Sequence, residues 1–158
     1  MNNQLTIFDL QFQKLHALSC ELIEKTPNEK LFWQPNKTDA SFPVNSCGEY
    51  ILQSAGTVEQ TFNGITTKLW DDPFEWTLPE ALSTSSLILE YLAEVEETRR
   101  RGFAFFQSDG DLSRELPAPE KLKTIFELLL ETTASAENFQ GRAFAIFRFF
   151  SNEKLLKS

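Results

Sequence analysis

Four stretches of the chain repeat apolar residues every three or four positions, the spacing that puts them on one face of an α-helix. The longest, Thr124 to Phe150, contains no proline and one glycine. We predict a helix there that begins as early as Glu120 or at Thr124, with Gln140 largely outside its buried face. Its apolar and small residues form one stripe: Ile125, Leu128, Thr132, Ser135, Phe139, Ala143, Ile146 and Phe150.

Two stretches in the first half of the chain show the same periodicity. One predicts a helix from about Leu5 to Lys25, with a stripe of Leu5, Phe8, Phe12, Leu15, Ser19, Leu22 and Ile23. The other begins at Ser46-Cys47-Gly48-Glu49, a capping box in which the serine and the glutamate satisfy two N–H groups of the first turn. We expect it to end at Leu69 or Trp70, and its stripe comprises Ile51, Ala55, Val58, Phe62, Ile65 and Leu69.

The remaining helix is predicted from Ser83 or Thr84 to about Phe106. Its apolar face holds Ile88, Leu92, Val95, Phe103 and Phe106, with Tyr91 beside them. Arg99 falls on this face too, and we expect its side chain to extend into solvent rather than to form an anion site. Four such helices with long connections predict an all-α protein, a four-helix bundle with crossover-type loops in a single domain over residues 1–158.

Composition excludes several classes of protein but does not indicate a function. Fifteen phenylalanines and six glycines in 158 residues suit packed helices better than a turn-rich β fold. The net charge of −8 argues against a nucleic-acid partner, which needs clustered Lys and Arg. The N-terminus lacks a signal segment, and no stretch approaches the ~20 apolar residues of a membrane span. We therefore expect a soluble cytoplasmic protein with no membrane partner.

Residues that commonly do chemistry are few. Cys20 and Cys47 lack CxxC spacing, so we expect two reduced thiols. His16 is the single histidine, and we favour a partly buried structural role for it over that of a lone catalytic base. Phosphate-loop, His-Glu-x-x-His and calcium-loop patterns are absent from the sequence. Loop aspartates, among them Asp71 and Asp72, are interpreted as helix stops and turn residues.

Three local patterns, in this order and spacing, resemble the DinB/YfiT superfamily of four-helix-bundle proteins over nearly the whole chain. Residues 29–35, EKLFWQP, are similar to the turn that follows the first helix of that family. Residues 46–52, SCGEYIL, resemble its Ser-x-Gly-Glu opening of the second helix. Residues 124–142 resemble its last helix in spacing.

The resemblance implies a metal site whose ligands this chain does not carry. Members of the family commonly hold a divalent metal with three histidines, and those positions correspond here to Gln53, Ser135 and Phe139. A following Arg-Gly-Gln triplet corresponds to residues 140–142, QGR, and keeps only its glycine. An amide, a hydroxyl and a phenyl ring are a poor donor set for zinc or nickel. We therefore predict no metal and no cofactor.

Gln53 has two interpretations. Helical periodicity places it almost opposite the stripe of Ile51, Val58 and Phe62, beside Gly56, Thr57 and Gln60. Either this helix is buried on two sides and Gln53 faces a polar cavity, or Gln53 is an exposed surface glutamine.

Three hypotheses about function remain open. The first is a non-catalytic bundle that binds a small apolar or amphipathic molecule in a pocket around Gln53, Ser135, Asn138 and Phe139. The second, implied by the resemblance, is an enzyme that transfers a small thiol or performs hydrolysis with a rearranged carboxylate metal site near Glu131. The third, compatible with the first, is a homodimeric interaction module.

Overall fold

The chain forms four long helices, two short 3₁₀ helices and one hairpin within residues 3–35, 44–73 and 81–155, the parts that the computed structural model describes. The prediction of a mostly helical chain is confirmed. In order, the elements are α1 (Asn3–Lys25), η1 (Asn28–Lys30), α2 (Cys47–Thr67), α3 (Ser85–Phe103), η3 (Asp109–Ser113), β1 (Glu115–Pro117), β2 (Leu122–Thr124) and α4 (Ile125–Phe147).

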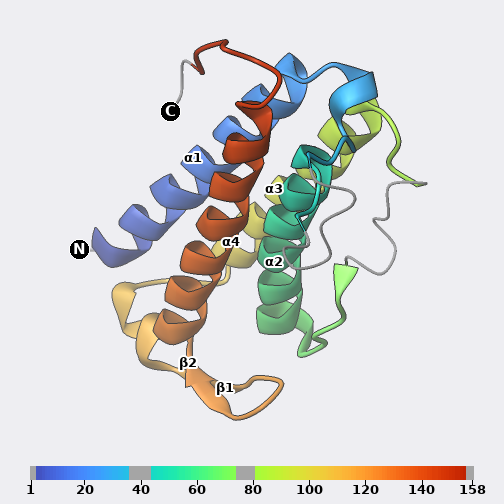
Figure 1. The fold of residues 1–158 in the computed structure, drawn as a ribbon. Helices are drawn as coiled ribbons and strands as arrows, with labels where there is room; N and C mark the ends of the chain where they lie inside the picture. Colours follow the sequence, from blue (N-terminus) through green and yellow to red (C-terminus); the bar gives the residue numbers. More distant parts are fainter. Residues whose placement is uncertain (1–2, 36–43, 74–80, 156–158) are drawn as a thin grey trace.

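The four helices lie around one shared core. In Figure 1, α1 and α4 run in one direction while α2 and α3 run in the opposite direction. Helix α2 packs mainly on α4 and α3, and α1 packs mainly on α3 and α4, so each helix has two close neighbours. At the centre, Phe12 of α1 and Phe62 of α2 meet edge to face with ring centroids 5.3 Å apart, and Phe103 of α3 packs against both.

The start of α2 explains why two of the sequence patterns occur together. Ser46 Oγ accepts a hydrogen bond from Glu49 N at 3.2 Å, as the capping-box prediction required. Gly48 N donates to Leu31 O at 2.7 Å, and a Cβ at Gly48 would lie 2.7 Å from the same oxygen. The turn after α1 therefore fits against α2 only because position 48 has no side chain.

Three predicted helix ends are wrong. Helix α2 ends at Thr67, because Lys68 adopts the left-handed conformation (φ 65°), and Leu69 is exposed. Helix α3 ends at Phe103, so Phe106 joins the core from outside the helix. Helix α4 ends at Phe147, and Phe150 beyond it packs on Trp33 at 5.9 Å between ring centroids.

The hairpin was not predicted. Strand β1 pairs antiparallel with β2, with Glu115 opposite Thr124 and Pro117 opposite Leu122. Strands of three residues are too short to show an alternating pattern. Helix α4 therefore begins after Thr124, whose hydroxyl accepts a hydrogen bond from Glu127 N at 3.0 Å, and not at Glu120.

The buried face of α4 is wider than predicted and is centred differently. Ala136, Gln140 and Phe147 are buried, whereas Ser135 and Phe139 are half-buried at its edge. The reason is that α4 packs on α1 as well as on α2. Gln140, expected outside the buried face, donates from Nε2 to Leu15 O and to Ser19 Oγ, both at 2.8 Å.

Arg99 does not extend into solvent, contrary to the prediction. Its side chain is 1 % exposed, and its guanidinium group donates to both oxygens of Glu96 and to Asp9 of α1. The Phe103 ring lies beneath it, 5.2 Å from centroid to Cζ. Sequence periodicity places a residue on a face but does not show that acidic groups will meet it there.

Candidate functional site

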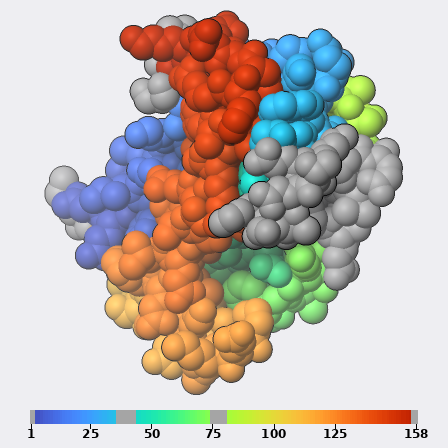
Figure 2. All heavy atoms as spheres, in the orientation of Figure 1, coloured from blue at the N-terminus to red at the C-terminus, as the bar shows by residue number. Residues whose placement is uncertain are grey.

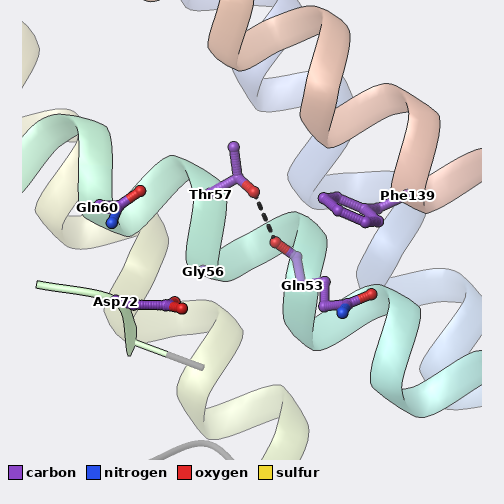
Figure 3. A pocket seen from close by; sticks show the side chains of 6 residues that line it. All are labelled: Gln53, Gly56, Thr57, Gln60, Asp72 and Phe139. Atoms are coloured by element: carbon purple, nitrogen blue, oxygen red, sulfur yellow. Dashed lines mark hydrogen bonds between the residues drawn. The ribbon is translucent and has the colours of Figure 1, made fainter. Parts of the chain in front are cut away.

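A cavity of about 240 Å³ lies between α2 and α4. Four of its residues follow one another along a single face of α2 at the spacing i, i+3, i+4 and i+7. Helix α4 adds a phenyl ring, and the segment after α2 adds a carboxylate (Figure 3). The described residues that line the cavity are Gln53, Gly56, Thr57, Gln60, Asp72 and Phe139.

The segment that carries Asp72 is held in place by Trp70. The indole ring of Trp70 lies on Gly64, where a Cβ would come within 2.4 Å of the ring. Trp70 Nε1 donates to Pro117 O of β1 at 3.1 Å, and Trp70 O accepts from Gln60 Nε2 at 2.9 Å. The hairpin, α2 and the segment after α2 thus fix one side of the cavity together.

Gln53 is the unusual residue of this cavity. Its Oε1 atom is buried and has no hydrogen-bond partner. The Gln53 main-chain carbonyl, by contrast, accepts a hydrogen bond from Thr57 Oγ1 at 2.8 Å (Figure 3). A buried acceptor without a partner costs about 1–3 kcal/mol, so a native chain that keeps one invites the question of what satisfies it.

Elsewhere along α4, the buried polar groups have partners. Ser54 Oγ of α2 donates to Ala136 O at 2.8 Å. Thr61 Oγ1 of α2 and Thr132 Oγ1 of α4 lie 2.6 Å apart. These contacts show that α2 is buried on two sides, and they make the lack of a partner at Gln53 specific to the cavity.

The four residues predicted to form a pocket are only partly brought together. Gln53 and Phe139 both line the cavity. Ser135 is half-buried and Asn138 is exposed, and neither is among the lining residues. Thr57 and Gln60 line the cavity beside Gln53, as helical periodicity predicts. Asp72, which the sequence analysis interprets as a helix stop, was not predicted to lie there.

The side chains at the three positions that the resemblance aligns with metal ligands do not fit a metal. Gln53, Ser135 and Phe139 together offer one amide oxygen and one hydroxyl, without imidazole, thiolate or carboxylate. Within residues 3–35, 44–73 and 81–155, no three His, Cys, Asp or Glu side chains form a group able to hold an ion. Glu131, the candidate for a rearranged site, is exposed and pairs with Lys123 Nζ at 2.7 Å.

His16 and the two cysteines lie away from this cavity. His16 is half-buried, and its ring nitrogens lie 3.6 and 3.8 Å from Cys20 Sγ, one turn further along α1. Neither cysteine forms a disulfide. Burial raises the pKa of the Cys47 thiol to about 12, against a smaller opposite effect of the Thr26 hydrogen bond, so Cys47 stays protonated and unreactive at neutral pH.

Glu59 of α2 and Tyr91 of α3 form a second, partly buried polar pair. Tyr91 Oη of α3 donates a hydrogen bond to Glu59 Oε2. Burial raises the pKa of Glu59 above its usual 4.5, and the Tyr91 hydrogen bond opposes that shift. Burial likewise raises the pKa of Tyr91, to which the charges of Glu59, Asp72 and Glu94 add. Several carboxylates therefore surround this part of α2.

Comparisons with protein-family models, with curated proteins and with solved structures found no match to this chain. The resemblance to the DinB/YfiT superfamily therefore stays a prediction. No helix in the described part of the chain is both long and apolar enough to cross a lipid bilayer.

Proposed function

We propose that this chain is a four-helix bundle of the DinB/YfiT type without the metal site of that family, and that it binds a small molecule in the cavity between α2 and α4. The observation that carries the proposal is the buried Gln53 Oε1, which has no partner and belongs to a residue that lines a cavity of about 240 Å³. A bound molecule with a hydrogen-bond donor satisfies that atom once the Gln53 amide turns towards the cavity. Gln53 and Phe139, two of the positions that correspond to metal ligands in the family, then serve a ligand instead.

The residues that line the cavity favour ligand binding without catalysis. Of the described residues that line the cavity, Asp72 is the one with an ionisable side chain. Apart from that carboxylate, the amides, the hydroxyl and the phenyl ring supply neither an activated nucleophile nor a general base. Two cysteines that form no disulfide suit a reducing compartment, and we propose that the protein acts in the cytoplasm.

The metal content of the protein tests the first part of this proposal. Protein purified without an affinity tag or chelator is analysed for zinc, nickel, iron and manganese per chain, before and after soaking with each. We expect less than about a tenth of an equivalent throughout, since the donors are poor. Close to one equivalent would overturn the proposal and favour the metal-dependent transferase or hydrolase.

A screen of small compounds by NMR tests the second part. Ligands of the cavity are expected to shift the side-chain amide signals of Gln53 and the main-chain amide signal of Gly56 together. Replacing Gln53 with methionine removes the acceptor and is expected to abolish these shifts at Gly56. Compounds that bind the wild-type and the Gln53→Met variant equally well would contradict a role for this atom.

A homodimer is a second proposal, compatible with the first, and exposed apolar residues on α1 and α4 support it. These helices lie side by side on the face shown in Figure 2. Phe8 of α1 meets Phe126 of α4 at 5.6 Å between ring centroids. Around that contact, the two helices expose large apolar side chains: Ile7 (65 %), Leu10 (57 %), Leu130 (53 %) and Phe126 (39 %).

Sedimentation analysis tests the dimer. We expect wild-type protein to dimerise and Leu130→Glu to be monomeric, because a charge at the centre of an apolar interface must be desolvated. Leu69→Glu, at a leucine just after α2 that is 61 % exposed, is the control and is expected to dimerise like the wild type. A wild-type protein that is monomeric at high concentration would contradict the dimer.

A further inference from the structure

Cys20 and His16 lie one turn apart on α1 and bring a thiol against an imidazole ring. Cys20 Sγ lies 3.6 Å from His16 Nε2 and 3.8 Å from His16 Nδ1. A ring nitrogen with a lone pair is therefore within reach of the thiol in either neutral tautomer. A base in this position can take the thiol proton and leave a thiolate, which is the nucleophilic form of cysteine.

The two cysteines of the chain differ in their access to solvent. Cys20 is half-buried and keeps some contact with solvent, whereas Cys47 is fully buried at the start of α2. Burial also raises the pKa of the Cys47 thiol to about 12. A reagent in solution therefore meets one cysteine that is accessible and has a base beside it, and a second that is neither accessible nor ionised.

The charged groups around the pair favour a proton on the ring. His16 lines a cavity of about 30 Å³ together with Glu96 of α3, and the residues that α2 adds to this lining are uncharged. Arg99 pairs with Glu96 and with Asp9, which lies two turns before His16 on α1. Glu24, one turn after the thiol, opposes a thiolate, but it is exposed and its charge is screened by solvent. The carboxylate nearest the ring thus supports transfer of the thiol proton to His16.

We propose that Cys20, activated by His16, is a modification site at which this chain forms a mixed disulfide with a small disulfide from solution. His16 accepts the thiol proton, and the Cys20 thiolate attacks one sulfur atom of the disulfide. The original sulfur–sulfur bond breaks as the new bond to Cys20 forms, and the second sulfur leaves as a thiolate that takes the proton from the ring. Cys20 is oxidised and the departing thiol is reduced, so the small disulfide is the only oxidant. This site is separate from the cavity between α2 and α4 and does not depend on a ligand there.

Bis(2-hydroxyethyl) disulfide tests the site on the full chain, because it is small and uncharged. Intact-mass spectrometry follows formation of the mixed disulfide, and peptide analysis identifies the modified cysteine. We expect a single adduct on the folded wild-type protein, at Cys20, and no adduct on folded Cys20→Ser. An adduct that forms on Cys47 as fast as on Cys20 would overturn the assignment.

His16→Gln tests the imidazole, since glutamine keeps a polar side chain but cannot take up the thiol proton. At pH 7 we expect this variant to react about threefold more slowly than the wild type, because an ordinary cysteine is only a few per cent thiolate there. The factor is modest because a more readily formed thiolate is also a weaker nucleophile. At pH 9.5, above the ordinary cysteine pKa of about 8.5, the two rates should agree within about twofold.

Lys14→Gln is the matched control for charge. It removes a positive charge from an exposed position of α1, two residues before His16, and should leave the wild-type pH profile of the reaction unchanged. Equal rates for the wild type and His16→Gln at pH 7 would overturn the proposed pair. A rate ratio between them that is the same at every pH would also overturn it, because that result indicates a change of access to Cys20 rather than of its ionisation.

Discussion

Gln53 carries an acceptor that the fold buries without a partner, which makes it the most informative single residue. We predict that Gln53→Met raises the free energy of unfolding of the ligand-free protein by about 1 kcal/mol, because an apolar side chain of similar length removes the cost of the unpaired oxygen. Urea unfolding measures the change. Gln60→Met is the control and is expected to lower stability by about 1 kcal/mol, since it leaves Trp70 O unpaired. A loss of stability in Gln53→Met would mean that the amide is satisfied in solution.

Arg99 is buried and paired with Glu96, so its removal is expected to destabilise the fold. Arg99→Ala is expected to lower the free energy of unfolding by about 3–5 kcal/mol, because the buried Glu96 then keeps only the exposed Arg100, 3.6 Å away, as a partner. Arg101→Ala, two residues along α3 and exposed, should change it by less than about 0.5 kcal/mol. Thermal or urea unfolding compares the two variants, and similar effects would show that the Arg99 network contributes little.

The sequence predicts which faces these residues occupy better than it predicts their partners. Periodicity placed Gln53 opposite the main stripe of α2 and Arg99 on the inner face of α3, and both placements agree with the structure. The partners come from other elements: Asp9 lies on α1, ninety residues before Arg99. Asp72 reaches the cavity only because Trp70 packs on Gly64 and bonds to the hairpin. No local pattern encodes such contacts.

At the scale of elements, α2 has a second buried face, which the sequence leaves as one of two interpretations of Gln53. Sequence analysis assigned one stripe to each helix, and the stripe of α1 is buried as predicted. Helix α2 is buried towards both α3 and α4, and its second face is built from small and polar residues such as Ser54 and Thr61. A hydrophobicity pattern does not detect such a face, because its burial is stabilised by hydrogen bonds rather than by large apolar side chains.

The pair Thr61–Thr132 tests how α2 and α4 are joined. Thr61→Val or Thr132→Val alone is expected to cost about 1–3 kcal/mol, because each leaves the other hydroxyl buried without its partner at 2.6 Å. The double variant should be more stable than the sum of the single effects predicts, by about 1 kcal/mol or more. A double-mutant cycle by urea unfolding measures this coupling, and strictly additive losses would show that the two hydroxyls do not interact.

For the whole molecule, helix content was predictable and the connections were not. Four amphipathic stretches of about twenty residues leave few alternatives to packed helices. The hairpin and the path from α2 to Asp72 depend on a few specific contacts within short segments. That is also why the cavity could be anticipated from Gln53 and Phe139 while its charged residue could not. The charged residue of the cavity lies on a connecting segment, and the connecting segments are the part of this fold that is hardest to predict from the sequence.

The dependence of stability on pH is a property of the whole molecule, set by carboxyl groups with shifted pKa values. Main-chain hydrogen bonds from Leu5 and Gln107 lower the pKa of Asp109 and of Asp111, respectively, below 3.8. Their stabilising effect is present above pH 3.8 and is lost as the pH falls through the folded pKa. Glu59 acts in the opposite sense. Its pKa is raised by burial, so the folded protein holds a proton more tightly, and stability falls as the pH rises from 4.5 through the folded pKa.

We therefore predict that the free energy of unfolding is higher near pH 4.5 than at neutral pH. Glu59→Gln is expected to remove most of the loss of stability between these two pH values. Glutamine still accepts the Tyr91 hydrogen bond but has no charge to desolvate. The free energy of unfolding in urea, measured from pH 4 to pH 8, should be higher for Glu59→Gln than for the wild type at pH 7 and should converge with it near pH 4.5. Glu90→Gln removes one exposed charge from α3 and should leave the wild-type profile unchanged. Parallel profiles for Glu59→Gln and the wild type would mean that Glu59 is hydrated in the folded protein, and the part of α2 around Glu59 would then be open to solvent.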